Sequence, residues 1–375
     1  MGSNASDKEP LSISAGQLSS GEAAREDSPE VSAIPDIAGN VSHKGEAAGE
    51  NIDSHLRSDA ENSQEPSAES KANVSDEKAD PSDIEMERQK KIKLLEFVRK
   101  ELHKARTYTP RVGVFGVTGV GKSSLCNALF GRDVAKISDV AACTRSPQEI
   151  MIGDAANGGL ILVDVPGVGE NEARDIEYIE LYKSLMPEMD LVLWAIKADD
   201  RAYSSAVRAY KTAVKPHLGK CPVVFVITHT DKIEPFREWD IENKRPGEKQ
   251  LHNITLKEHE ISKEFDIPVS SVVAVSAHDH YNLDALVTRV VEVLPNEKKV
   301  SFTREAREEN VTPETIAVAE TGLMDYVAEK LGDAAYYIRH ELVDMATEAI
   351  KNHLPKVVTT VATVFSGWLK ERWRW

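Results

Sequence analysis

One glycine-rich stretch restricts the fold of this chain more than any other feature. Residues 116–123 have the sequence GVTGVGKS, follow a β-branched run at 111–116, and lead directly into a helical pattern at 123–129. This is the G-x-x-x-x-G-K-[ST] pattern in the context of strand, glycine loop and helix that it requires. The glycines let backbone N–H groups turn toward a phosphate chain, and the helix start adds a positive dipole end. Chance gives about one such match per hundred chains of this size, so we expect a phosphate site rather than a flexible turn.

The same loop predicts the groups that would contact the phosphates. Lys122 supplies a positive charge between the β- and γ-phosphates, and the Ser123 hydroxyl offers a ligand to Mg²⁺. The nucleotide-binding residues expected here are Gly116, Val117, Thr118, Gly119, Val120, Gly121, Lys122, Ser123 and Ser124.

The pattern beyond the loop predicts an α/β domain at about 108–296. Short β-branched runs lie at 111–116, 149–153, 160–164, 191–196, 223–228 and 272–276, and helical patterns lie at 123–129, 178–185, 204–214, 256–265 and 283–294. Strands that alternate with helices imply a mostly parallel, six-stranded sheet with helices on both faces and ligands at the carboxyl ends of the strands. The second and third runs are the exception, because Gly158-Gly159 spaces them as a hairpin.

The segments on either side of this domain differ from it in composition. Residues 1–82 hold 17 acidic and 6 basic side chains, 16 serines and no aromatic residue, so we expect a disordered acidic leader. An amphipathic helix is predicted at 83–107, with Ser82 and Glu85 as its capping box. After Pro295 a charged linker is expected, then helical patterns at 313–331 and 333–354 within a C-terminal region of 297–375.

The end of the chain allows two interpretations. Val357, Val361, Val364, Phe365 and Trp368 fall on one helical stripe, and Lys370, Arg372 and Arg374 alternate with the last tryptophans. This is the composition of a helix that lies in a membrane interface through residues 355–375. The same stripe could instead pack within the chain, on the helices at 313–354 or back onto the α/β domain, and we favour such intramolecular packing.

Charge and cysteine content exclude several classes of protein. The net charge of −16 argues against general nucleic-acid binding by bulk electrostatics. Three widely spaced cysteines suit reduced thiols better than a disulfide framework. Residues 1–30 lack the pattern of a secretory signal and are too acidic for a mitochondrial presequence. We therefore expect a cytoplasmic protein, peripheral on the inner face of the membrane if the tail binds lipid.

Two further motifs point to a guanine nucleotide. Asp164-Val165-Pro166-Gly167 is a D-x-x-G at a strand end, in which Asp164 would hold Mg²⁺ through water and the Gly167 N–H would meet the γ-phosphate. The fifth run ends in Thr228-His229-Thr230-Asp231, and the sixth ends in Ser276-Ala277. A carboxylate at Asp231 can accept the N1–H and amino protons of guanine, whereas adenine would leave it unpaired. The backbone at Ala277 would donate to the guanine O6.

With these motifs assembled, the chain resembles the Era/TrmE/EngA-type small GTPases, and most closely the YeeP-like group under the "50S ribosome-binding GTPase" heading. The strings that carry the likeness are GVFGVTGVGKSSLCNALFG (113–131), SDVAACTRSPQE (138–149), LVDVPGVGE (162–170) and LWAIKADDRAY (193–203). The resemblance implies a P-loop fold and Mg²⁺-dependent hydrolysis of GTP to GDP and phosphate by Lys122, Thr144 and Gly167. Thr144 would be the switch threonine that closes on Mg²⁺ and the γ-phosphate.

The chain departs from that family pattern at three positions. His229 stands where a lysine would pack along the base, which predicts modest affinity. Val168 follows Gly167 in place of a water-orienting glutamine, so we expect slow turnover, about 10⁻⁴ to 10⁻³ per second without a partner. Gly119 replaces an asparagine with which some relatives bind K⁺, and this leaves potassium stimulation in doubt. Arg145 and Arg201 could supply charge to the transition state, although we favour their interpretation as solvated surface residues.

Three functions remain open on these residues. The leading hypothesis is a slow GTP-dependent switch that an unknown protein effector or activator reads. The second is a scaffold of the septin or immunity-GTPase type that self-associates on a membrane and uses GTP to time assembly. The third is a ribosome-associated assembly factor, against which stands the lack of an RNA-binding module. An ATPase is the chemical alternative, and it would make Asp231 accidental.

Overall fold

The computed structural model describes residues 80–131, 147–154 and 158–338, together with 340–342, 344, 345 and 348. Three of the sequence predictions lie outside the described residues. They are the disordered leader predicted at 1–82, of which only residues 80–82 are described, the switch position Thr144 with its neighbour Arg145, and the C-terminal stripe at 355–375.

A six-stranded sheet forms the centre of the described chain, with the strand order β2-β3-β1-β4-β5-β6. Its strands are β1 (Arg111–Gly116), β2 (Gln148–Ile152), β3 (Leu160–Asp164), β4 (Leu191–Lys197), β5 (Val223–Thr228) and β6 (Val272–Ala274). All neighbouring pairs are parallel except β2 and β3, which pair antiparallel. The mostly parallel sheet and the hairpin at Gly158-Gly159 are therefore both confirmed.

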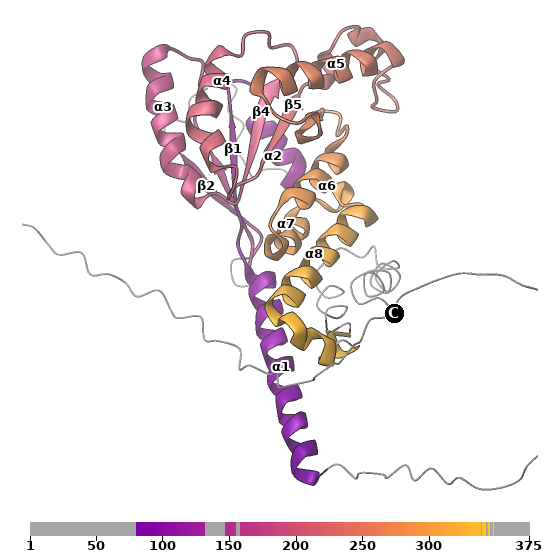
Figure 1. The fold of residues 1–375 in the computed structure, drawn as a ribbon. Coiled ribbons are helices and arrows are strands. Elements are labelled where there is room, and N and C mark those ends of the chain that lie inside the picture. The colour runs from indigo at the N-terminus through magenta and orange to yellow at the C-terminus, as the bar shows by residue number, and fades with distance from the viewer. Residues whose placement is uncertain are drawn as a thin grey trace, which may run out of the picture. The chain divides into compact units, whose positions relative to one another are not determined.

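Helices cover both faces of this sheet (Figure 1). They are α2 (Lys122–Phe130), α3 (Glu172–Leu185), α4 (Ser204–Ala209) with a π-helical continuation (Tyr210–Val214), α5 (Glu248–Phe265) and α6 (Leu283–Val293). Short 3₁₀ turns lie at Met186–Glu188, Lys215–His217, Thr230–Lys232, Phe236–Glu238, Val269–Ser271, Asn296–Lys298 and Glu308–Asn310. One core cluster joins buried residues of α3, α4 and α5 to the sheet, while α2 and α6 contact each other across from it.

The strand register builds an aromatic row through that core. Phe115 pairs with Trp194, and Trp194 pairs with Phe225, so the three rings lie side by side on one face of the sheet. Tyr182 of α3 packs 4.5 Å from the Phe115 ring, and Phe265 of α5 packs 5.1 Å from the Phe225 ring, measured between centroids. These interlocked rings fix the helices against the sheet and hold the strand ends in register.

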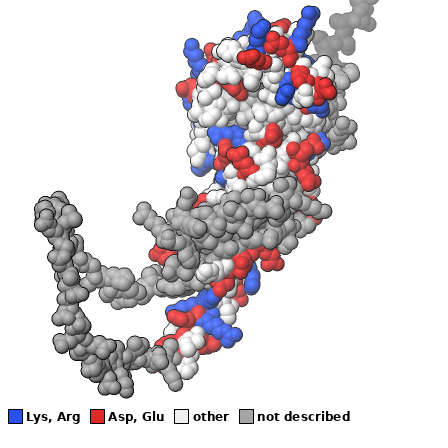
Figure 2. Space-filling model, turned by 90° about the vertical axis from the view of Figure 1, so that its right-hand side faces the viewer, with Lys and Arg blue, Asp and Glu red and all other residues white. Residues whose placement is uncertain are grey.

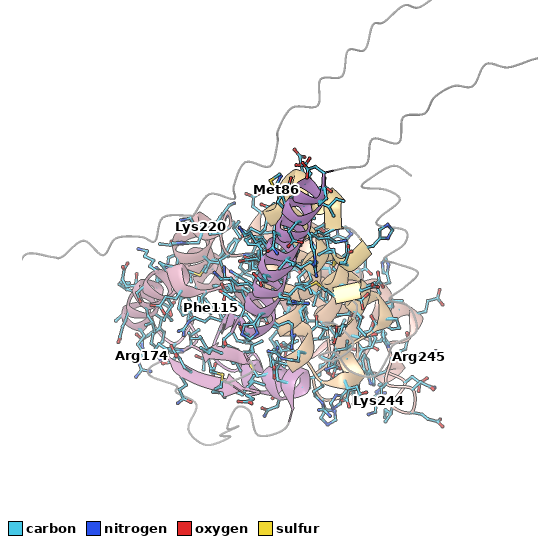
Figure 3. All side chains as sticks on the ribbon, turned by 90° about the horizontal axis from the view of Figure 1, so that it is seen from below. Met86, Phe115, Arg174, Lys220, Lys244 and Arg245 are labelled. Atoms are coloured by element: carbon cyan, nitrogen blue, oxygen red, sulfur yellow. The ribbon has the colours of Figure 1, made fainter. Side chains whose placement is uncertain are left out.

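Segments from before and after the α/β domain form a helical unit. It lies at the end of the sheet where the parallel strands begin (Figure 1). It combines α1 (Pro81–Thr107), α7 (Lys299–Glu305), α8 (Pro313–Leu331) and a 3₁₀ helix (Gly332–Ile338). Helix α1 contacts all three of the others. Its first thirteen residues, 81–93, are exposed, and Met86 stands at the free end of the helix in Figure 3.

A buried carboxylate ties this helical unit to the sheet. Asp190, just before β4, accepts from the Tyr108 hydroxyl (3.0 Å), the Arg111 N–H (2.8 Å) and the Lys298 ammonium (2.6 Å). The three donors come from the α1–β1 connection, β1 and the turn before α7. One side chain therefore joins the segments that enter and leave the α/β domain.

Two local predictions differ from the structure. Helix α1 begins at Pro81 with Asp80 as its N-cap, because the Asp80 carboxylate accepts from the Ser82 N–H (2.9 Å); Ser82 lies inside the helix and does not cap it. The expected charged linker after Pro295 contains α7, whose Val300 and Phe302 are buried. None of the described helices is both long and apolar enough to cross a bilayer.

Candidate nucleotide site

The phosphate loop connects the end of β1 to the start of α2 and needs its glycines for geometric reasons. Gly116 has a φ of +142°, and a Cβ there would lie 2.3 Å from the Ala195 carbonyl oxygen of β4. Gly121, the N-cap of α2, has a φ of +86° in the left-handed region. A side chain at either position would be strained, so the two glycines are required by the path of the loop itself.

Lys122 and Asp164 face each other at the phosphate end of the site. The Lys122 ammonium donates to the Val117 carbonyl within the loop (3.2 Å). Burial lowers the pKa of Lys122, and the nearby Asp164 carboxylate partly opposes this shift. The pKa of Asp164 is raised by burial, against the influence of Lys122. Both charges are therefore costly to bury. A bound phosphate would compensate the charge of Lys122, and a bound cation would compensate that of Asp164.

The donor set at this end fits Mg²⁺. Asp164 is 7% exposed, and its Oδ1 is buried without a hydrogen-bond partner among the described residues. Ser123 lies in the first turn of α2, next in sequence to Lys122, whose charge interacts with that of Asp164; a carboxylate and a hydroxyl oxygen are therefore both available at this end of the site. Mg²⁺ prefers oxygen ligands, usually one or two from protein with water and phosphate completing the shell. Thr144, the third expected metal ligand, lies outside the described residues.

The D-x-x-G turn is in direct contact with the phosphate loop. The Thr118 N–H donates to the Val168 carbonyl (3.2 Å), and the Thr118 hydroxyl donates to the Gly167 carbonyl (3.0 Å). A Cβ on Gly167 would lie 2.3 Å from the Thr118 nitrogen. The close approach of the two loops therefore depends on Gly167 having no side chain.

Asp231 is held at the opposite end of the site by residues from two other elements. Its Oδ1 accepts from the Ser276 hydroxyl (2.7 Å), and Gln250 of α5 donates to its backbone carbonyl (3.3 Å). The Thr230 N–H donates to the Val275 carbonyl (3.3 Å), which fixes the turn against the chain after β6. The orientation of the Asp231 carboxylate is therefore set before any ligand arrives.

His229 and Thr228 join this end of the site to the phosphate loop. Thr228 is buried, and its hydroxyl donates to the Val120 carbonyl (2.6 Å). His229 has a φ of +58°, and its Nε2 lies 2.9 Å from where a Cβ on Gly121 would stand. Its pKa is lowered by burial and by the neighbouring Lys232 charge. A neutral imidazole therefore packs on the loop at neutral pH.

A cavity of about 640 Å³ opens between these elements. We call it the histidine-lined cavity, after His229, His278 and His280 in its wall. The complete lining is Gly121, Ser124, Asn127, Ala128, Thr228, His229, Asp231, Lys232, Ala277, His278, His280 and Arg307. A volume of this size lies within the range of small-molecule sites.

The structure brings most of the expected site residues together. Of these, Gly121, Ser124, Thr228, His229, Asp231 and Ala277 line the cavity, Ser276 supports it, and the rest of the phosphate loop lies next to Asp164 and Gly167. The predictions missed Asn127 and Ala128, which helical spacing from Ser124 could have indicated. They also missed His278, next to Ser276-Ala277. Arg307 carried no signal, because it lies in the stretch interpreted as linker.

The class of this protein is given by its similarity to a known protein family. The family described as "50S ribosome-binding GTPase" matches residues 111–229, which span the phosphate loop, the D-x-x-G turn and the fifth strand with His229. The chain belongs to this family of P-loop GTPases, and within it to the YeeP-like group. It is 39% identical over 204 residues to YfjP of Escherichia coli, covering 54% of this chain and 68% of YfjP.

Other relatives extend the same likeness. YeeP of Escherichia coli is 42% identical over 115 residues, which cover 31% of this chain and 48% of YeeP. Era, crystallised with MgGDPNP and a segment of 16S ribosomal RNA, is 25% identical, with a TM-score of 0.38 and coverage of 57% of this chain and 67% of Era.

Proposed function

We propose that this chain binds GTP and GDP with Mg²⁺ and acts as a slow, nucleotide-dependent switch that hydrolyses GTP to GDP and phosphate. The observation that carries the proposal is the position of Asp231. Its carboxylate is held by Ser276 in the wall of a cavity whose other end, at Gly121 and Ser124, is the phosphate loop. A base and a phosphate chain joined by a ribose would reach both ends at once.

The base end supports guanine over adenine. A carboxylate accepts hydrogen bonds and donates none, so it pairs with the N1–H and amino group of guanine. Adenine presents an acceptor at N1 and would leave the carboxylate unpaired. A site built around a hydrogen bond rejects a ligand that lacks its partner by about 10⁴-fold.

The phosphate end supports hydrolysis without covalent help from the protein. Mg²⁺, when bound, neutralises charge on the β- and γ-phosphate oxygens. Lys122 would add its charge there, and the loop N–H groups would donate to the phosphates. These groups position the γ-phosphate and stabilise developing charge, which is most of what phosphoryl transfer requires.

The residue after Gly167 supports a slow rate. Val168 is fully buried within the core cluster, so its side chain contacts no solvent and cannot orient an attacking water. Arg201 is exposed, which matches its interpretation as a surface residue. We therefore expect intrinsic turnover of about 10⁻⁴ to 10⁻³ per second. Turnover of tens per second by the purified chain would contradict this part of the proposal.

The contact between the loops supports a switch. In this structure Thr118 donates two hydrogen bonds to the backbone of Gly167 and Val168. A γ-phosphate that accepts from the Gly167 N–H would add a contact to this same turn, and hydrolysis would remove that contact. Such gain and loss of contacts is how a nucleotide biases a two-state element.

The visible surface gives no reason to extend the RNA ligand of Era to this chain. On the face drawn in Figure 2, the Lys and Arg side chains of the described residues are interspersed with Asp and Glu. Phosphate backbones are bound by gathered positive charge. We therefore propose no RNA ligand for this chain.

The deciding experiment is calorimetric binding of GDP and xanthosine diphosphate by the wild type and Asp231→Asn. The amide presents a donor that meets the 2-carbonyl of xanthine, so preference should move from guanine to xanthine. Asp240→Asn is the matched control, because Asp240 lies in an exposed turn with Asn243 and lines no part of the cavity. Unchanged GDP affinity in Asp231→Asn would refute the assignment of the base.

A further inference from the structure

One wall of the histidine-lined cavity comes from outside the α/β domain. Arg307 follows α7 and lines the cavity together with Asn127 and Ala128 of α2. The cavity is therefore closed on this side by the part of the chain that follows the α/β domain, which we call the C-terminal flank. The sequence pattern had predicted a linker there.

The segment that carries Arg307 is docked on the end of α2. The Arg307 N–H donates to the Leu129 carbonyl (2.9 Å), and the Asn310 amide donates to the Ala128 carbonyl (2.9 Å). The Phe302 ring of α7 packs edge-on against Phe130, with 5.8 Å between centroids. The carbonyls at the end of a helix need such donors. Because α2 begins in the phosphate loop, this one helix joins the nucleotide site to the helical unit.

The Arg307 guanidinium has a weak partner. It pairs with the Glu309 carboxylate (2.9 Å), whose side chain is 53% exposed, and His280 lies 3.5 Å from the same carboxylate. An ion pair whose carboxylate is exposed to solvent contributes little to stability. Arg307 can therefore turn to another partner in the cavity at little cost.

We propose that Arg307 contacts the ribose and base half of a bound guanine nucleotide, so that filling the cavity tightens the docking of residues 306–311 on α2. This inference rests on the proposed function. Arg307 shares the cavity with Asp231 and Ala277 at the base end, whereas Lys122 and Asp164 at the phosphate end are not in its wall. The base and ribose are common to GTP and GDP, so the C-terminal flank responds to occupancy and not to the γ-phosphate.

Nucleotide binding and the docking of residues 306–311 on α2 are coupled in both directions. A ligand that gains a contact from Arg307 binds more tightly, and by linkage the segment holds more tightly to α2 when the ligand is present. Coupling of this kind typically changes affinity by about fivefold or more.

The first test measures the affinity of the full chain for unlabelled GDP by calorimetry, since a fluorophore on the ribose would alter the contact in question. Arg307→Ala should weaken binding at least fivefold. Arg245→Ala removes the same charge from an exposed turn outside the cavity, at the outer edge of the molecule in Figure 3, and should leave affinity within twofold. An Arg307→Ala affinity within twofold of wild type overturns the inference.

The second test uses the wild-type chain and hydrogen exchange. Saturating GDP and a non-hydrolysable GTP analogue should slow exchange at residues 306–311 to the same extent. Protection of 116–124 without any change at 306–311 would overturn the inference and leave the proposed function standing. Absence of GDP binding by the wild type would overturn both.

Discussion

Replacing Gly167 with alanine should separate the phosphate loop from the D-x-x-G turn. The new Cβ would lie 2.3 Å from the Thr118 nitrogen and 2.6 Å from the Val117 carbonyl carbon, where ordinary contact begins at 3.4 Å. Both obstructing atoms belong to the backbone and cannot rotate away. The two loops must therefore move apart by about 1 Å.

This movement breaks identifiable contacts. The hydrogen bonds from Thr118 to the Val168 and Gly167 carbonyls measure 3.2 and 3.0 Å, and a further 1 Å takes both beyond hydrogen-bonding distance. Each contributes about 0.5–1.5 kcal/mol net. We expect Gly167→Ala to lower the free energy of unfolding by about 2 kcal/mol and to abolish any difference in affinity between GTP and GDP.

Urea unfolding and calorimetric titration with both nucleotides check the two effects. Gly219→Ala is the matched control, since a Cβ there meets no atom within 4 Å, and it should leave the free energy of unfolding within about 0.5 kcal/mol. If Gly167→Ala unfolds at the same urea concentration as Gly219→Ala, the reasoning from close approach is wrong.

Three further substitutions test the electrostatics. Asp190→Ala should lower the free energy of unfolding by about 3–5 kcal/mol, because it leaves the Lys298 ammonium buried without its anion; a loss below 1 kcal/mol in urea would contradict this. Burial holds the pKa of His229 below its ordinary 6.5. The contribution of the neutral ring to the free energy of unfolding is therefore present above pH 6.5 and is lost as the pH falls toward the lowered pKa. An NMR titration of the ring checks the pKa, and the free energy of unfolding of His229→Gln should depend less on pH than that of the wild type. Burial raises the pKa of Glu320 to about 7. The contribution of its protonated carboxyl group to the free energy of unfolding is therefore present below pH 4.5 and is lost as the pH rises through 7. Glu320→Gln should therefore gain about 2–3 kcal/mol on wild type between pH 5 and 8, and parallel unfolding profiles would exclude this.

Where local pattern and burial agree, the sequence was sufficient to predict the fold. The strands Arg111–Gly116, Leu160–Asp164 and Val223–Thr228 and the helix Pro313–Leu331 have the predicted bounds. Each strand is a β-branched run between turn residues, and the helix has Thr312 as its cap and a proline in its first turn. Such signals lie within a few residues of one another and need no tertiary context.

The C-terminal flank shows where that reasoning fails. Helix α7 is seven residues long, and its Ser301 and Thr303 are fully buried although they are polar. Ser301 donates to the Ala105 carbonyl at the end of α1 (3.2 Å), and Thr303 donates to the Lys299 carbonyl within the helix (2.9 Å). The buried Ser301 has a partner that is remote in sequence, so the local pattern resembles a solvated linker. Arg307 was missed for the same reason.

The division of the helical unit between the two flanks sets an order for folding during synthesis. Ala105 and Ser301, which hydrogen bond across the α1–α7 contact, are 196 residues apart in the chain. A ribosome needs roughly 10–40 s to add that many residues. During that interval α1 has been synthesised, with its apolar residues Leu94 and Val98, but the helices that bury these residues have not. Nascent chains stalled before residue 299 should therefore expose this surface, and they are where we expect a chaperone to bind.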